Sequence, residues 1–117
     1  MAVIQGVCGS DPDGGPAYDP VTRRLFVPCR DGGIQVIDVG SRRLGPRLEG
    51  ANGAPIVVGG TLWAATYPDG GLAGFSTTSG RRLQELDPGP LPTFATPTFA
   101  GGTLLIGTRT GVVAFGR

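Results

Sequence analysis

Residues 59–65, Gly-Gly-Thr-Leu-Trp-Ala-Ala, and residues 101–107, Gly-Gly-Thr-Leu-Leu-Ile-Gly, are two copies of one pattern. In each copy a Gly-Gly pair precedes an apolar run that has the length of a short strand. Gly-Gly between two apolar runs is typical of a tight β-hairpin, because the turns that suit twisted strands need positive φ angles. The pattern therefore predicts hairpins, and its recurrence predicts a repeat protein.

The repetition extends over most of the chain. Proline opens each unit at positions 16, 55 and 97, and glycine opens the third segment of each unit at positions 33, 71 and 111. Four short segments separated by Gly, Pro and Asp-Gly turns, in a repeat of about 40 residues, are typical of a β-propeller blade. We therefore predict an all-β fold of about three propeller blades, each a four-stranded antiparallel sheet.

The repeats are expected over residues 15–50, 54–90 and 94–117, within a single segment that covers 1–117. The third unit stops after its third strand. Residues 2–7 are expected to form an N-terminal strand, which would supply the missing outer strand within one chain or between chains. Three blades are too few for a ring, because propellers typically have about four to eight. We therefore expect either a homo-oligomer or the remainder of a longer propeller.

The composition limits both chemistry and partners. The chain has 22 Gly, 11 Pro, no His and a net charge of +1. Without His it cannot hold a Ser-His-Asp or Cys-His pair or the commonest zinc sites. The small net charge provides no field for nucleic acid or an anionic membrane, and no segment is apolar enough to span a bilayer. We expect neither nucleic acid nor membrane as a partner.

The two cysteines, Cys8 and Cys29, are 21 residues apart and flank the Gly- and Pro-rich segment 11–18. We expect a disulfide, which would stabilise the fold by about 3 kcal/mol on the chain-entropy model. The alternative is two unrelated thiols. A disulfide favours an extracellular or periplasmic, secreted location. The first four residues lack the basic and apolar regions of a signal peptide, so none is expected in this chain.

The units resemble the repeats of the pyrroloquinoline-quinone-like, or quinoprotein-alcohol-dehydrogenase-like, β-propeller family. The resemblance covers residues 15–117 and is carried by segments 59–64, 79–83, 101–108 and 111–115. Cysteines placed before and after an Asp-Pro…Thr hairpin resemble those of secreted actinobacterial members. Two features depart from the family pattern: the Asp that ends the third strand survives only as Asp38, and the outer-strand Trp is absent from both complete units.

In the enzymes of that family, the resemblance implies a quinone held by a Trp, adjacent cysteines, a calcium ion and an Asp base. Cys8 and Cys29 are not adjacent, and Trp63 aligns with Phe26 and Leu105 at an inner-strand packing position. We therefore expect no cofactor and no catalytic residue, and predict a non-catalytic scaffold or binding module. The alternatives are a fragment of a quinone-dependent dehydrogenase and a small oligomeric lectin-like binder.

Two sets of residues are candidate sites. Asp11 and Asp13 precede glycines as in a fragment of a calcium loop, although Pro12 and the missing acidic ligand favour a turn. Trp63, Tyr67 and Asp69 are expected near the loop ends, where they would line a ligand face. The arginine pairs at 42–43 and 81–82 recur at matching positions, and we interpret them as solvated outer edges that block strand pairing.

Overall fold

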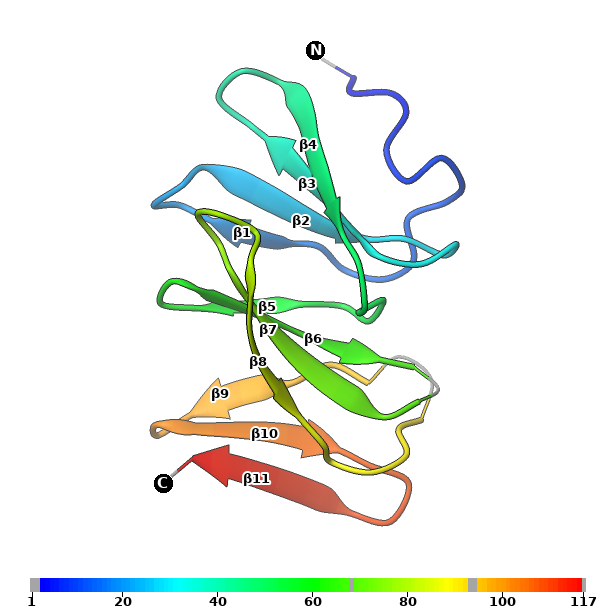
Figure 1. The fold of residues 1–117 in the computed structure, drawn as a ribbon, viewed down its shortest axis with the longest axis vertical. Helices are drawn as coiled ribbons and strands as arrows, with labels where there is room; N and C mark the ends of the chain where they lie inside the picture. The colour runs from blue at the N-terminus through cyan, green and yellow to red at the C-terminus, as the bar shows by residue number, and fades with distance from the viewer. Residues whose placement is uncertain (1–2, 68, 93–94, 117) are drawn as a thin grey trace.

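The computed structural model describes residues 3–67, 69–92 and 95–116, and it is a stack of antiparallel sheets without a helix in those residues (Figure 1). No described segment is therefore a long apolar helix that could cross a membrane. The all-β prediction is confirmed.

The strands of the first sheet are β1 (Ala17–Asp19), β2 (Arg24–Pro28), β3 (Ile34–Asp38) and β4 (Arg43–Leu48). Those of the second are β5 (Ile56–Val58), β6 (Thr61–Thr66), β7 (Gly71–Ser76) and β8 (Arg82–Leu86). Those of the third are β9 (Thr98–Ala100), β10 (Thr103–Gly107) and β11 (Val112–Gly116).

The hairpins form where the Gly-Gly pairs predict them. β5 pairs with β6 and β9 pairs with β10, each across a turn that begins with glycine. Gly59 and Gly101 both have a φ of +58°, which is the left-handed region that glycine enters without a steric penalty. The same local chemistry therefore builds the first hairpin of the second and third sheets.

The sheets lie face to face along the 42 Å length of the molecule, in the order of the sequence (Figure 1). Side chains alternate across each strand. In β6, Leu62 and Ala64 pack into a core shared with the first sheet, whereas Trp63 and Ala65 pack into a core shared with the third. Because the middle sheet is covered on both faces, its inner strands are almost continuously apolar.

The expected N-terminal strand over residues 2–7 is not formed, and residue 2 lies outside the described residues. Residues 3–7 pair with no strand. Gly6 and Cys8 have φ angles of +78° and +69°, so the chain turns where a strand would stay extended. The two termini also lie at opposite ends of the stack (Figure 1), so this segment does not reach β11. It covers the first sheet instead.

Asp19 fixes the turn between β1 and β2. Its side chain is 2% exposed, and its carboxylate accepts hydrogen bonds from the Val21 N–H at 3.1 Å and the Thr22 hydroxyl at 2.7 Å. Burial raises the pKa of Asp19, but these hydrogen bonds outweigh burial, so its pKa lies below the ordinary value of 3.8. The ionised carboxylate therefore stabilises the folded state.

We expect Asp19→Asn to lower the free energy of unfolding at pH 7 by about 1.5–3 kcal/mol, the usual contribution of hydrogen bonds to a charged group. Because the pKa is lower in the folded state, this stabilisation is present above pH 3.8 and is lost as the pH falls through the folded value. Urea unfolding at pH 7 and pH 3 should show the difference between wild type and variant shrinking in acid. Asp69→Asn, at an exposed carboxylate, is the control and should change little. A difference that is the same at both pH values would contradict the assignment.

Candidate interaction surface

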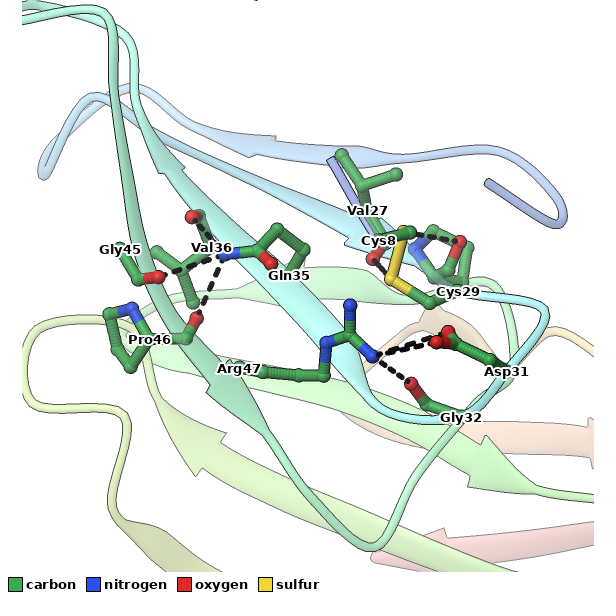
Figure 2. Close-up of a disulfide and its surroundings, with 11 residues drawn as sticks. Cys8, Val27, Cys29, Asp31, Gly32, Gln35, Val36, Gly45, Pro46 and Arg47 are labelled. Atoms are coloured by element: carbon green, nitrogen blue, oxygen red, sulfur yellow. Dashed lines mark hydrogen bonds and ion pairs between the residues drawn. A yellow bond between two sulfur atoms is a disulfide. The ribbon is translucent and has the colours of Figure 1, made fainter. Parts of the chain in front are cut away.

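One end of the stack is closed by the N-terminal segment. Cys8 and Cys29 form a disulfide with Cα atoms 5.2 Å apart, which confirms the expected pairing (Figure 2). The buried disulfide packs with Val27 and Ile37 on the face of the first sheet that points away from the second, and residues 4 and 7 pack against this cluster. In the second and third sheets the same face packs against the preceding sheet. The segment therefore covers the face of the first sheet that, in the other two sheets, packs against the preceding sheet.

Polar contacts hold the outer strand at this closed end. Gln35 is buried in β3 and donates a hydrogen bond from Nε2 to the Gly45 carbonyl at 2.8 Å. Arg47 of β4 donates to the Asp31 carboxylate at 3.2 Å and to the Gly32 carbonyl at 3.3 Å (Figure 2). These bonds tie β4 to β3 and to the turn that follows Cys29. The N-terminal segment thus covers the outer face of the first sheet, and the disulfide links it covalently to Cys29. The hydrogen bonds hold the outer strand of the same sheet.

The other end of the stack is open. Leu104 and Ile106 of β10 are buried against the second sheet, so the alternating residues point the other way. The ladders β10–β11 and β9–β10 give the residues that share this outward direction. We call the set the open face; its members are Thr98, Ala100, Thr103, Leu105, Gly107, Val112, Ala114 and Gly116. None of them is charged.

The repeat shows what normally happens to such a face. Val112 occupies the position of Leu72 in the second sheet and Ile34 in the first, and both of these side chains are 0% exposed under the next sheet. Val112 itself is 71% exposed. Leu105 likewise corresponds to Trp63, which packs between the second and third sheets. The open face therefore occupies the position of the buried inter-sheet surfaces of the first and second sheets, and Val112 on it is exposed.

Sequence reasoning did not identify the residues of this face, although the signal was present. The alignment of the glycines at 33, 71 and 111 already placed Val112 in register with Ile34 and Leu72. What the sequence lacks is the direction of each side chain, because a continuously apolar strand has no alternation that tells one face from the other.

The predicted ligand-face residues Trp63, Tyr67 and Asp69 each line a different cavity, although Tyr67 and Asp69 lie two positions apart between β6 and β7. Trp63 is half-buried beside a 290 Å³ cavity between the second and third sheets. Tyr67 is held by Asn52, which bonds its backbone N–H at 2.8 Å and its carbonyl at 2.9 Å, next to a 60 Å³ cavity. Asp69 lines a third cavity of 450 Å³ with Arg82.

Asp11 and Asp13 belong to an extension of the first hairpin. The Asp11 carbonyl accepts the N–H of Arg30 at 2.9 Å, and the N–H of Asp13 donates to the Pro28 carbonyl at 2.8 Å. The Asp11 carboxylate lies 3.9 Å from the exposed Arg30 guanidinium. No group of three His, Cys, Asp or Glu side chains in the described ranges is arranged to hold a metal ion. The backbone of Asp11 and Asp13 thus extends the hairpin that carries Cys29 of the disulfide.

The described residues do not fit the quinone site that the family resemblance implies. The two cysteines are 21 positions apart and form a structural disulfide, and Trp63 packs between sheets. Asp38, the remaining family aspartate, accepts the Ser41 N–H at 2.9 Å. That hydrogen bond lowers the pKa of Asp38 and commits its carboxylate to a turn. These contacts support packing and turn roles.

No family model and no curated protein matches the sequence. Solved structures do match. BamB from Moraxella catarrhalis aligns with a TM-score of 0.74 and 18% identity over 92% of this chain and 32% of BamB. The computationally designed Ika4 protein aligns with a TM-score of 0.63 and 17% identity over 80% of this chain and 60% of Ika4. The dihydro-heme d1 dehydrogenase NirN aligns with a TM-score of 0.64 and 15% identity over 87% of this chain and 25% of NirN.

These likenesses confirm a partial β-propeller and establish the fold alone. The chain spans about a third of BamB and a quarter of NirN. A dehydrogenase and a computationally designed protein share the fold, so fold does not select the function.

We expect the double variant Cys8→Ser, Cys29→Ser to lose about 3 kcal/mol of unfolding free energy, the loop-closure contribution of a disulfide over this separation. It should also bind more 8-anilinonaphthalene-1-sulfonate, because the segment that covers Val27 and Ile37 is released. Urea unfolding and dye fluorescence measure the two effects. Reduced wild-type protein is the matched control and should behave like the variant. Unchanged stability and unchanged dye binding would show that the segment does not cover the sheet.

Proposed function

We propose that the chain is a non-catalytic propeller segment of the pyrroloquinoline-quinone-like repeat type, and that it acts as a scaffold or binding module. Its open face packs against another protein surface, either further blades of a longer propeller or another copy of the chain. The observation that carries this proposal is the contrast at one repeat position, where Leu72 is 0% exposed and Val112 is 71% exposed.

The energetics favour a partner for this face. Burial of one Val or Leu side chain contributes about 1.5–3 kcal/mol. Val112 and Leu105 lie on the same face with Ala114 between them in the ladder, and no charge interrupts them. An exposed apolar surface of this kind usually marks a protein–protein contact.

The acidic side chains support a structural role. Asp19 and Asp38 bind turns, Asp31 pairs with Arg47, and Glu85 pairs with Arg82 at 3.0 Å. Each of these carboxylates is engaged in a turn or in an ion pair. The disulfide supports a secreted, extracellular or periplasmic location, since such bonds persist in oxidising compartments.

We expect the purified chain to associate as its concentration rises, and Val112→Arg to suppress that association by placing a charge on the open face. Light scattering coupled to size-exclusion chromatography measures the mass. Val21→Arg is the matched control, because Val21 is 88% exposed at the first hairpin turn and should leave association unchanged. A wild-type chain that remains monomeric at every concentration, with no binding by the open face, would contradict the proposal.

We also expect no dye reduction when pyrroloquinoline quinone, calcium and an alcohol are added to the chain. The described residues that the resemblance would assign to a quinone site are occupied in a disulfide, a turn and an inter-sheet core. A dye-linked dehydrogenase assay is the measurement. Turnover above a heat-denatured control would overturn the non-catalytic assignment.

A further inference from the structure

The edge of β11 differs from the corresponding edges of the other two sheets. In the first sheet β4 pairs with β3, and in the second β8 pairs with β7. Within the described residues, β11 pairs with β10 alone. The open edge is thus the place in the third sheet where the other sheets carry an outer strand.

Backbone geometry identifies the groups that face this edge. The Thr108 N–H donates to the Gly111 carbonyl at 2.7 Å at the β10–β11 turn. Because hydrogen-bonded pairs alternate in an antiparallel ladder, Val113 and Phe115 direct their backbone groups to β10, whereas Val112 and Ala114 direct theirs to the open edge. The second sheet uses the equivalent set, since the Ser76 N–H donates to the Arg81 carbonyl beside β8 at 2.8 Å.

The outer strands of this chain show which sequence fits such an edge. Residues 43–48 and 81–86 both begin with Arg, carry a charge at the fifth position and end with Leu. The final leucines lie opposite Ile34 and Leu72. In both sheets the register shifts at the same place, where the third and fourth residues of the outer strand share one partner position. The two strands therefore define one pattern.

The third sheet has an aromatic side chain at the position where the second sheet binds an arginine of its outer strand. Phe115 corresponds to Phe75, and the Arg82 guanidinium lies over the Phe75 ring at 5.5 Å. Phe115 and Gly116 border the 290 Å³ cavity beside Trp63. A cationic side chain opposite Phe115 would lie over its ring and fill this cavity, a contact that commonly contributes about 0.5–2 kcal/mol.

We propose that the open edge of β11 binds an extended peptide of a partner polypeptide as an antiparallel fourth strand. Opposite Val113 and Val112 the peptide carries the charged residue and the leucine that both outer strands have. Opposite Phe115 it carries an arginine, as β8 has Arg82 opposite Phe75, whereas β4 has Leu44 at this position. A second copy of this chain is disfavoured as the donor, because its two strands of this pattern are already paired within their own sheets. The inference rests on the proposed function and deepens it, since it defines the chemistry of the partner.

The test uses a fluorescein-labelled peptide that copies residues 79–88, titrated with the disulfide-intact chain and followed by fluorescence anisotropy. We expect saturable binding, and roughly tenfold weaker binding when the Leu86 of the peptide is replaced by Asp. A scrambled peptide of the same composition is the control. Absence of binding, or equal binding of the scrambled peptide, would overturn the inference.

A variant of the chain separates the edge from the open face. Ala114→Pro removes an N–H from the edge but none that pairs with β10, so peptide binding should fall by roughly tenfold or more. Ala114→Ser keeps the N–H and should bind the peptide like wild type. Leu105→Arg, on the open face but in β10, should suppress association of the chain and leave peptide binding at the edge of β11 unchanged. Association without peptide binding contradicts the edge inference alone, whereas loss of both from the wild-type chain contradicts the proposed function.

Hydrogen exchange tests the same edge without a substitution, in case the proline variant does not fold. The amides of Val112 and Ala114 should exchange slowly only when the peptide is bound. Those of Val113 and Phe115 should be protected in either state. Peptide binding that leaves the exchange of Val112 and Ala114 unchanged would place the peptide elsewhere and overturn the inference.

Discussion

The structure depends on burying both faces of each sheet against a neighbour. Strands such as β6 and β7 carry apolar side chains on both faces, so a single sheet in water would expose both apolar faces. Stacking solves this for the second sheet, which is covered by the first on one side and the third on the other. The same requirement applies at the two ends of the stack, where no further described sheet is available.

The two ends meet this requirement in different ways. At the first sheet, a segment without regular secondary structure is anchored by a disulfide and supplies the apolar side chains that a preceding blade would supply. At the third sheet, nothing among the described residues covers Val112 or pairs with β11 beyond β10. The two ends of the stack therefore differ. The outer face of the first sheet is covered by the N-terminal segment, whereas Val112 and the edge of β11 are uncovered among the described residues. This difference is the basis of the proposed binding role.

Much of the fold could be predicted from local sequence chemistry. Gly59-Gly60 and Gly101-Gly102 located the hairpins, and the recurring prolines and glycines located the repeats, because turn geometry depends on a few adjacent residues. The path of residues 3–7 could not be predicted, since an apolar run alone does not reveal whether it pairs as a strand or covers a sheet. The arginines at 81–82 are exposed at the outer edge, as their repetition indicates, and the Arg82 guanidinium also lies over the Phe75 ring. The recurring residue type indicated the exposure, but the contact with Phe75 depends on how β8 pairs with β7.

The most direct test of the unequal ends is carbene footprinting with mass spectrometry, at a concentration where light scattering shows a monomer. The three residues to compare are Ile34, Leu72 and Val112, which share one repeat position and are 0%, 0% and 71% exposed. The stacked arrangement requires strong labelling at Val112 and protection of the other two. Similar labelling at all three positions would show that the sheets are not stacked in this order.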